Sequence, residues 1–191
     1  MASEIPTAVT VASHSSVLNK QVRELFTTPY FTVLESTDMI GVQLGGAIKN
    51  VIAIAAGILH GLKYGTNTKS VLLARGIAEI VRLGRKMKAK SSTFLGLSGL
   101  GDLATTCFSE HSRNHTCGVA IGQGKALSQI VSGTEMIIEG IDAARSARRL
   151  SRKYRVSMPI AEAVYQVLFE KKNPKIVVQA VMSQRLFHEL D

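Results

Sequence analysis

The chain has 191 residues, of which 46% are hydrophobic and 19% charged, a globular composition that excludes a disordered or fibrous protein. Its 23 Lys and Arg against 14 Asp and Glu give a net charge of +9, which favours anionic partners such as phosphorylated metabolites, nucleic acid or acidic lipid. The longest apolar run, Val51–Leu59, is about half of what a membrane-spanning helix needs. With two cysteines and no signal-peptide pattern, we expect a cytoplasmic protein without membrane insertion.

The first 38 residues alternate between strand and helix patterns. β-Branched residues predict a strand over Thr7–Ser13, apolar residues at helical spacing predict a helix over Ser16–Phe26, and a second strand is predicted over Tyr30–Leu34. Such a strand–helix–strand unit is too small to be a domain by itself, and its strand edges need a partner sheet. We therefore expect residues 1–38 to be the C-terminal remnant of a larger domain.

From residue 39 onward the pattern is helical, with short connections at glycine, asparagine and proline. The predicted helices cover Ile40–Leu62, Thr68–Met87, Leu103–Cys107, Cys117–Gln123, Ala126–Val131, Gly140–Tyr154, Ile160–Glu170 and Pro174–Gln184. The expected fold class is mainly α, with a short βαβ remnant (1–38) leading into an all-helical domain (39–191).

Lys49 and Asn50 interrupt the most apolar of these predicted helices. Burying an ammonium group costs several kcal/mol unless it is paired. A desolvated lysine whose pKa falls towards neutrality suits a general acid or base. The preceding Gly45 and Gly46 would let a second backbone or a ligand approach closely. A lysine that reaches solvent from the edge of the helix is the alternative.

A glycine-rich stretch, GLSGLGDLATTCFSEHSRN (96–114), holds a second group of polar residues. Its glycine order differs from the dinucleotide-binding fingerprint. Asp102 is expected at a helix start, where a capping role competes with a role in a site. Ser112, Arg113 and Asn114 combine a hydroxyl, a guanidinium and an amide, which are donors suited to a phosphate.

The same stretch and its continuation contain four side chains that ligate metals in other proteins. They are Cys107, His111, His115 and Cys117. Their spacing matches no standard zinc pattern, because neither cysteine belongs to a C-x-x-C pair and Glu110–His111 is not part of H-E-x-x-H. No metal site is predicted.

Two features lie further along the chain. Glu139, before Gly140, either contacts a sugar hydroxyl or begins the acidic first turn of the next helix. The segment Arg145–Arg155 places four arginines at a spacing that forms one cationic helical face. A solvated surface face is the ordinary interpretation, with contact to acidic membrane or nucleic acid as the alternative. Because tryptophan is absent and aromatic residues are few, no nucleic-acid partner is expected.

Together these residues resemble the C-terminal part of the bacterial-type NAD(P)-dependent sn-glycerol-3-phosphate dehydrogenases. The resemblance rests on the segments IPTAVTVAS, TPYF, GVQLGGAIKNVIAIAAGI, GLSGLGDLATTCFSEHSRN, IIEG and MPIAEAVYQVL in this order and covers essentially the whole chain. It implies a Rossmann-like cofactor domain and a helical substrate domain similar to the C-terminal domain of 6-phosphogluconate dehydrogenase. The implied reaction is reversible hydride transfer between NAD or NADP and C2 of dihydroxyacetone phosphate or glycerol 3-phosphate, which feeds glycerophospholipid synthesis.

The resemblance also implies roles for single residues. Lys49 is similar to the family lysine that exchanges a proton with the C2 oxygen, and Asp102 to the aspartate that fixes this lysine and the substrate hydroxyls. Arg113 matches a residue near both the substrate phosphate and the dinucleotide. The other implied positions are Ser112 and Asn114 at the phosphate, Asn50 and Thr106 as second-rank substrate contacts, and Ile137 and Glu139 at the cofactor.

One part of the family pattern is missing from the 191 residues, namely the G-x-G-x-x-G loop together with most of the parallel sheet. An oxidoreductase chain without that loop is expected to be inactive or nearly so by itself. Two alternatives remain open: a non-catalytic phosphate-binding or oligomerisation module, and a basic helical nucleic-acid binder. A homodimer is compatible with the sequence.

Overall fold

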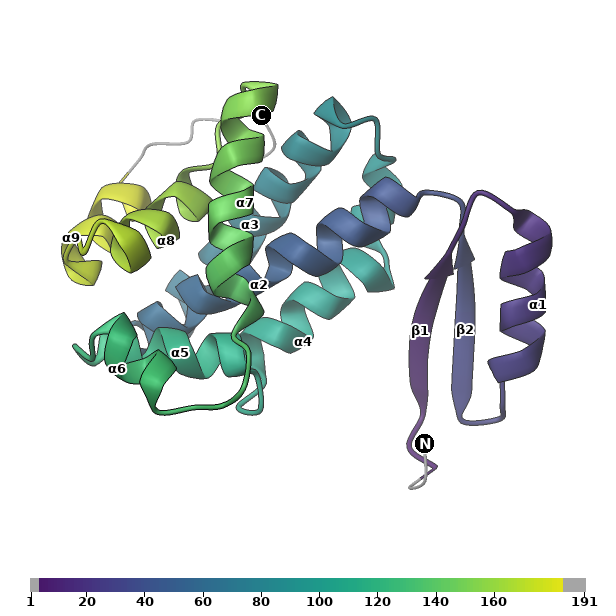
Figure 1. The fold of residues 1–191 in the computed structure, drawn as a ribbon, viewed down its shortest axis with the longest axis horizontal. Coiled ribbons are helices and arrows are strands. Elements are labelled where there is room, and N and C mark those ends of the chain that lie inside the picture. Colours follow the sequence, from purple (N-terminus) through teal and green to yellow (C-terminus); the bar gives the residue numbers. More distant parts are fainter. Residues whose placement is uncertain (1–3, 184–191) are drawn as a thin grey trace.

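The computed structural model describes residues 4–183 and places a small βαβ unit beside a larger helical body (Figure 1). Strands β1 and β2 pair in parallel, with Thr7 opposite Phe31 and Ala12 opposite Ser36. The three elements of the unit are β1 (Thr7–Ala12), α1 (Ser16–Phe26) and β2 (Phe31–Ser36), close to the predicted ranges.

Asn19 ties the helix of this unit to the ends of both strands. Its side chain is buried and its Nδ2 donates to the backbone oxygens of Ser13, at 3.4 Å, and Ser36, at 2.8 Å. The strands themselves expose apolar side chains such as Val9 and Leu34. Within residues 4–183 the sheet has two strands, so its outer edges have no partner in this part of the chain.

Eight α-helices make up the helical body within the described residues. They are α2 (Met39–Gly61), α3 (Thr66–Lys86), α4 (Asp102–Phe108), α5 (Arg113–Gly122), α6 (Leu127–Ser132), α7 (Glu139–Tyr154), α8 (Pro159–Phe169) and α9 (Pro174–Met182). Each corresponds to a predicted helix. The predicted end of the last helix, Gln184, lies outside the described residues.

Two local predictions were wrong. Helix α5 begins at Arg113 rather than Cys117, because the Ser112 side chain accepts a hydrogen bond from the His115 amide and caps the helix earlier. The connection before α4, which carried no predicted structure, is a 3₁₀ turn (η1, Ser91–Leu95) and a π-helical turn (η2, Leu97–Gly101) that runs directly into α4.

Helix α2 forms the centre of the body and contacts α3, α4, α5, α7 and α8. Contrary to the sequence-based expectation, it is long and apolar enough to cross a membrane. However, 72% of its most apolar 18-residue stretch is buried inside the protein, so α2 is the core helix of the fold. Residues 50–59 are buried without interruption, which explains why this part of the helix shows no amphipathic stripe.

Glycines allow α2 and α5 to approach each other backbone to backbone. A side chain at Gly57 would collide with the backbone oxygen of His115, and one at Gly118 with that of Ile54. One turn further, Gly61 and Gly122 meet in the same way. This contact fixes the position of α5, which carries Arg113 and Asn114, relative to α2, which carries Lys49.

The arginine face of α7 is partly used inside the protein. The Arg148 guanidinium lies 3.0 Å from carboxylate oxygens of both Glu162 and Glu170 and 3.9 Å from the ring centre of Tyr165. Arg145 lies over the ring of Phe169 at 4.3 Å. These two arginines therefore join α7 to α8, and the expected single solvated face is divided into an inner and an outer part.

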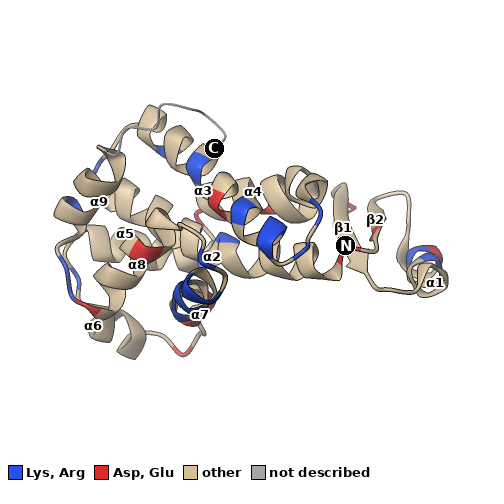
Figure 2. Cartoon of the chain, turned by 90° about the horizontal axis from the view of Figure 1, so that it is seen from above, with Lys and Arg blue, Asp and Glu red and all other residues tan. Residues whose placement is uncertain are grey.

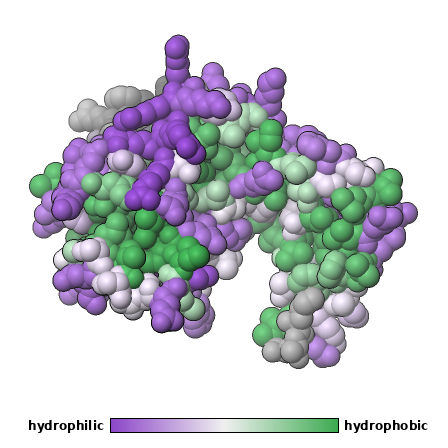
Figure 3. Space-filling model, in the orientation of Figure 1, coloured by the Kyte–Doolittle hydropathy of each residue, from purple (hydrophilic) through white to green (hydrophobic). Residues whose placement is uncertain are grey.

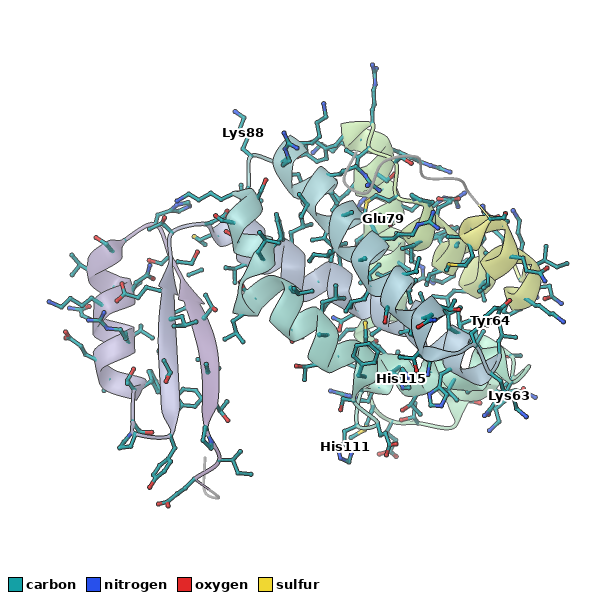
Figure 4. The ribbon with its side chains drawn as sticks, turned by 180° about the vertical axis from the view of Figure 1, so that it is seen from behind. Lys63, Tyr64, Glu79, Lys88, His111 and His115 are labelled. Carbon is teal, nitrogen blue, oxygen red and sulfur yellow. The ribbon has the colours of Figure 1, made fainter. Side chains whose placement is uncertain are left out.

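A buried carboxylate joins α3 to α8 (Figure 4). Glu79 is 1% exposed, and its two oxygens accept the backbone N–H groups of Ile160, at 2.6 Å, and Ala161, at 3.2 Å. It thereby caps the first turn of α8 from a different helix. Burial raises the pKa of Glu79 to about 7, although these N–H donors and the charges of Arg82 and Arg75 favour the ionised form.

This carboxylate makes stability depend on pH. Because the pKa of Glu79 rises from 4.5 to about 7 on folding, its contribution to stability is complete below pH 4.5 and is lost as pH rises through 7. We expect Glu79→Gln to gain stability relative to wild type by about 2 kcal/mol between pH 5 and pH 8. Urea unfolding at the two pH values measures this, with exposed Glu24→Gln as control. A difference that does not change with pH contradicts the prediction.

Candidate functional site

An ion pair between α2 and α4 lies at the centre of the candidate site. Lys49 Nζ is 2.5 Å from Asp102 Oδ1, and the two side chains are 21% and 37% exposed. The lysine is therefore neither a core residue nor a freely solvated one. Its ammonium is held by a carboxylate while part of its surface stays open to a ligand.

The π-helical turn brings Asp102 to this lysine. A side chain at Gly45 would collide with the backbone oxygen of Ser98, so only glycine lets η2 pass this close to α2, whereas Gly46 faces open space. Gly101, already in helical conformation, occupies the N-cap position, and Asp102 is the first residue of α4. The capping role considered for Asp102 is therefore wrong, and its carboxylate is available to Lys49.

Thr106 lies beside the same carboxylate. Its hydroxyl lies 2.6 Å from the backbone oxygen of Asp102 and 3.4 Å from Asp102 Oδ1. Since a hydroxyl has one hydrogen, the shorter contact takes it and leaves the oxygen able to accept from a ligand. The structure thus places Thr106, one of the implied substrate contacts, within reach of the Lys49–Asp102 pair.

A chain of amide hydrogen bonds connects α2, α5 and α7. Asn114 Nδ2 donates to Asn50 Oδ1 at 2.9 Å, and the Gly140 amide donates to Asn114 Oδ1 at 2.8 Å. Asn50 Nδ2 in turn donates to Glu139 Oε2 at 3.1 Å. Both asparagine side chains are buried, so these bonds fix the start of α7 against the residue that follows Lys49.

The amino end of α5 lies beside this amide chain. Ser112 caps the helix, and Arg113, whose side chain is exposed, donates from Nη1 to the backbone oxygen of Ile137 at 3.2 Å. The first-turn N–H groups of a helix have no acceptor within the helix and attract anions. The arginine adds the one cationic side chain among the residues that line the neighbouring cavity.

A polar cavity of about 280 Å³ opens at this helix end. The predicted residues that line it are Asn50, Thr106, Ser112, Arg113, Asn114, Ile137 and Glu139. Lys49 and Asp102 stand beside it, one residue from Asn50 and in contact with Thr106. Three lining residues, Thr105, Ser109 and His111, were not predicted. The available signal was the polar side chains of Ser109 and His111 in the S-E-H-S-R-N stretch and of Thr105 next to Thr106.

The four side chains of metal-binding type named above, Cys107, His111, His115 and Cys117, do not lie close together as a group. Cys107 and Cys117 are buried free thiols, and burial raises their pKa values to about 12 and about 11. His111 and His115 lie apart, with His111 at the cavity (Figure 4). His115 is buried instead against His60, with ring nitrogens 3.4 Å apart. Within residues 4–183, no three side chains of metal-binding type form a group.

Comparison with known proteins agrees with the motifs. A family model described as the C-terminus of NAD-dependent glycerol-3-phosphate dehydrogenase matches residues 38–179. The glycerol-3-phosphate dehydrogenase (NAD(P)+) of Desulfitobacterium hafniense is 49% identical over 98% of this chain and 53% of the relative. The protein of the same name from Fusobacterium nucleatum is 50% identical over 93% of this chain and 53% of that relative.

A solved structure extends this agreement to the fold. The crystal structure of glycerol-3-phosphate dehydrogenase from Coxiella burnetii matches with a TM-score of 0.93 and 37% identity, over 96% of this chain and 56% of that one. The chain spans about half the length of the relatives it matches. The extent of these matches shows that the chain belongs to the NAD-dependent glycerol-3-phosphate dehydrogenase family and corresponds to its C-terminal part.

Proposed function

We propose that this chain supplies the substrate-binding and proton-transferring half of an NAD(P)-dependent glycerol-3-phosphate dehydrogenase, which interconverts dihydroxyacetone phosphate and glycerol 3-phosphate. The observation that carries the proposal is the Lys49–Asp102 pair, which stands beside a polar cavity lined by Thr106, Arg113 and Asn114. Two cations at one cavity suit a small molecule that has both a carbonyl and a phosphate.

At the phosphate end, three kinds of donor converge. The free N–H groups of the first turn of α5, the Ser112 hydroxyl and the Arg113 guanidinium all lie at the cavity. The Asn114 side chain already uses its oxygen for Gly140 and one N–H for Asn50. In this proposal Asn114 therefore holds the phosphate through its backbone N–H and its remaining amide hydrogen, and it positions α5.

At the carbonyl end, Lys49 is the proton donor. NADH or NADPH, when bound, supplies the hydride that reduces C2. The Lys49 ammonium hydrogen-bonds the C2 oxygen, stabilises the negative charge that develops on it and transfers a proton to it. Asp102 orients the ammonium before the transfer, and its free oxygen can accept a hydrogen bond from a substrate hydroxyl. In the oxidation direction, the same amine takes the proton back.

The residues near the cavity fit a dinucleotide. Ile137 is 74% exposed although it is apolar, and its backbone oxygen binds the exposed Arg113. Glu139 adds an acceptor at the cavity rim. The space-filling view shows a deep hollow between the helical body and the βαβ unit (Figure 3). We propose that residues 1–38 belong to the dinucleotide-binding domain, that the substrate domain begins at residue 39, and that the protein is cytoplasmic.

Binding of the phosphate tests the first half of this proposal. We expect glycerol 3-phosphate to bind the chain, and Arg113→Ala to weaken binding by about tenfold to hundredfold, because a charge-assisted hydrogen bond is lost. Isothermal titration calorimetry measures the affinity. Arg85→Ala, which removes an exposed guanidinium from α3, is the matched control. Equal affinities of the two variants contradict a phosphate site at Arg113.

Turnover tests the second half. The segment of the Desulfitobacterium relative that precedes its match to this chain, fused ahead of residue 1, should restore NADH oxidation with dihydroxyacetone phosphate, whereas the 191-residue chain alone should be nearly inactive. In the fusion we expect Lys49→Met to lower kcat by about 10² to 10⁴-fold, with exposed Lys63→Met as control.

The outcomes of the fusion experiment separate the alternatives. A folded fusion that binds glycerol 3-phosphate but never turns it over favours the non-catalytic phosphate-binding module. An active fusion in which Lys49→Met leaves kcat unchanged removes Lys49 from the mechanism.

A further inference from the structure

Within residues 4–183, four helices are followed by a cation in the left-handed backbone conformation. Lys63, Lys88, Arg155 and Lys171 follow α2, α3, α7 and α8, with φ between 52° and 68°. Glycine adopts this conformation without the steric cost that an L side chain has, which is why it is the usual residue there. The chain itself uses Gly124, with φ of 95°, at the end of α5.

Two of these four cations belong to one surface. Arg82 Nε and Nη2 donate to the backbone oxygen of Ser157 at 3.4 and 3.3 Å, which holds the carboxyl end of α3 against the turn after α7. Neither 82–90 nor 149–157 contains an acidic residue. We call the exposed cations of residues 82–88 and 149–157 the basic tip; they are Arg85, Lys86, Lys88, Arg149, Arg152, Lys153 and Arg155.

The charges of the basic tip are not neutralised by the part of the chain that the structure describes. Within residues 4–183, none of the seven forms an ion pair, whereas Arg145 and Arg148 of the same α7 do. Seen from above, Lys and Arg segments gather on α3 and α7 (Figure 2). Their potentials therefore add at one end of the molecule, which attracts an extended anionic surface.

Helix stability alone does not account for this arrangement. Cations in the last turn of a helix interact favourably with its dipole, which explains Arg152 and Lys153. It does not explain why Lys88 and Arg155 stand where glycine would remove the conformational cost, and the same holds for Lys63 and Lys171. What sets Lys88 and Arg155 apart is that they stand among further exposed cations that form no ion pair within residues 4–183.

We propose that the basic tip docks this protein onto the surface of an anionic lipid bilayer. Clusters of four to eight cations bind acidic lipid headgroups, and each cation near the surface raises the affinity about fivefold. The tip is formed by two helix ends, and long hydrophilic side chains project outward from that end of the molecule (Figure 3). A convex end of this kind contacts a plane with many charges at once.

A nucleic acid fits the tip less well. Reading a groove requires the side of a helix or a β-ribbon, whereas here the helices present their ends. Stacking on bases requires exposed aromatic rings, and the aromatic residue of the two segments, Tyr154, is half-buried beneath Lys153.

Docking through the tip leaves the substrate cavity open. Glu139, the first residue of α7, lines the cavity, and Arg155 follows the last residue. The 16 residues of α7 separate the two by about 24 Å along the helix. The proposal therefore does not depend on the function assigned to the cavity.

Co-sedimentation with lipid vesicles tests the proposal on the 191-residue chain. Vesicles of 70% phosphatidylcholine and 30% phosphatidylglycerol should bind the chain at physiological salt, and pure phosphatidylcholine should not. Lys88→Gly with Arg155→Gly should weaken binding to the anionic vesicles by roughly 25-fold. The matched control is Lys63→Gly with Lys171→Gly, which removes the same charge at the same kind of helix end. Lys63 lies far from Lys88 (Figure 4), and Lys171 follows the carboxyl end of α8, whose amino end is the one that follows the tip.

Each outcome of this experiment either supports or overturns the proposal. Because glycine relieves the left-handed backbone, the melting temperature of both double variants should equal or exceed that of wild type, and glycerol 3-phosphate affinity should not change. No binding to anionic vesicles overturns the proposal, and so does an equal loss in both double variants, which would show attraction by net charge alone. Tighter binding to a 30-base-pair DNA duplex than to the vesicles, lost in the tip variant, overturns it in favour of nucleic acid.

Discussion

The candidate site follows from one constraint: α2 is buried on nearly every side, yet it carries Lys49 and Asn50 in its middle. A buried polar group without a partner costs about as much free energy as a typical point mutation removes. Each of the two must therefore be met by another element, and the structure meets Lys49 with Asp102 and Asn50 with Asn114. Partners required for stability thus become the residues that surround the cavity.

The close contact of α2 and α5 turns these pairings into a rigid geometry. Because Gly57 and Gly118 let the two backbones touch, Asn114 reaches Asn50 directly and the amino end of α5 cannot shift along α2. The proposed binding of a phosphate and a carbonyl at a fixed separation requires this kind of rigid support. Replacing either glycine would move the amino end of α5 without touching a residue that lines the cavity.

Much of this architecture could be predicted from the sequence, because long helices have strong periodicity and because Lys49 stands out in an apolar run. The failures lie where local structure depends on contacts distant in the chain. The π-helical turn 97–101 exists because Gly45 lets it pass over α2, and the early start of α5 depends on the Ser112 cap. Nor does any sequence spacing show that Arg148 faces the acids of α8 rather than solvent.

Helix α7 shows how one element divides its residues among three tasks. Its amino end, with Glu139 and the Gly140 amide, closes the site against Asn50 and Asn114. Its middle packs against α8 through Arg148, whose guanidinium contacts two carboxylates and the ring of Tyr165. Its carboxyl end keeps cations that no described carboxylate neutralises. The position of a cation along α7 therefore decides its role. The cations at the carboxyl end are the ones that form no ion pair within residues 4–183, so they can bind an anionic partner.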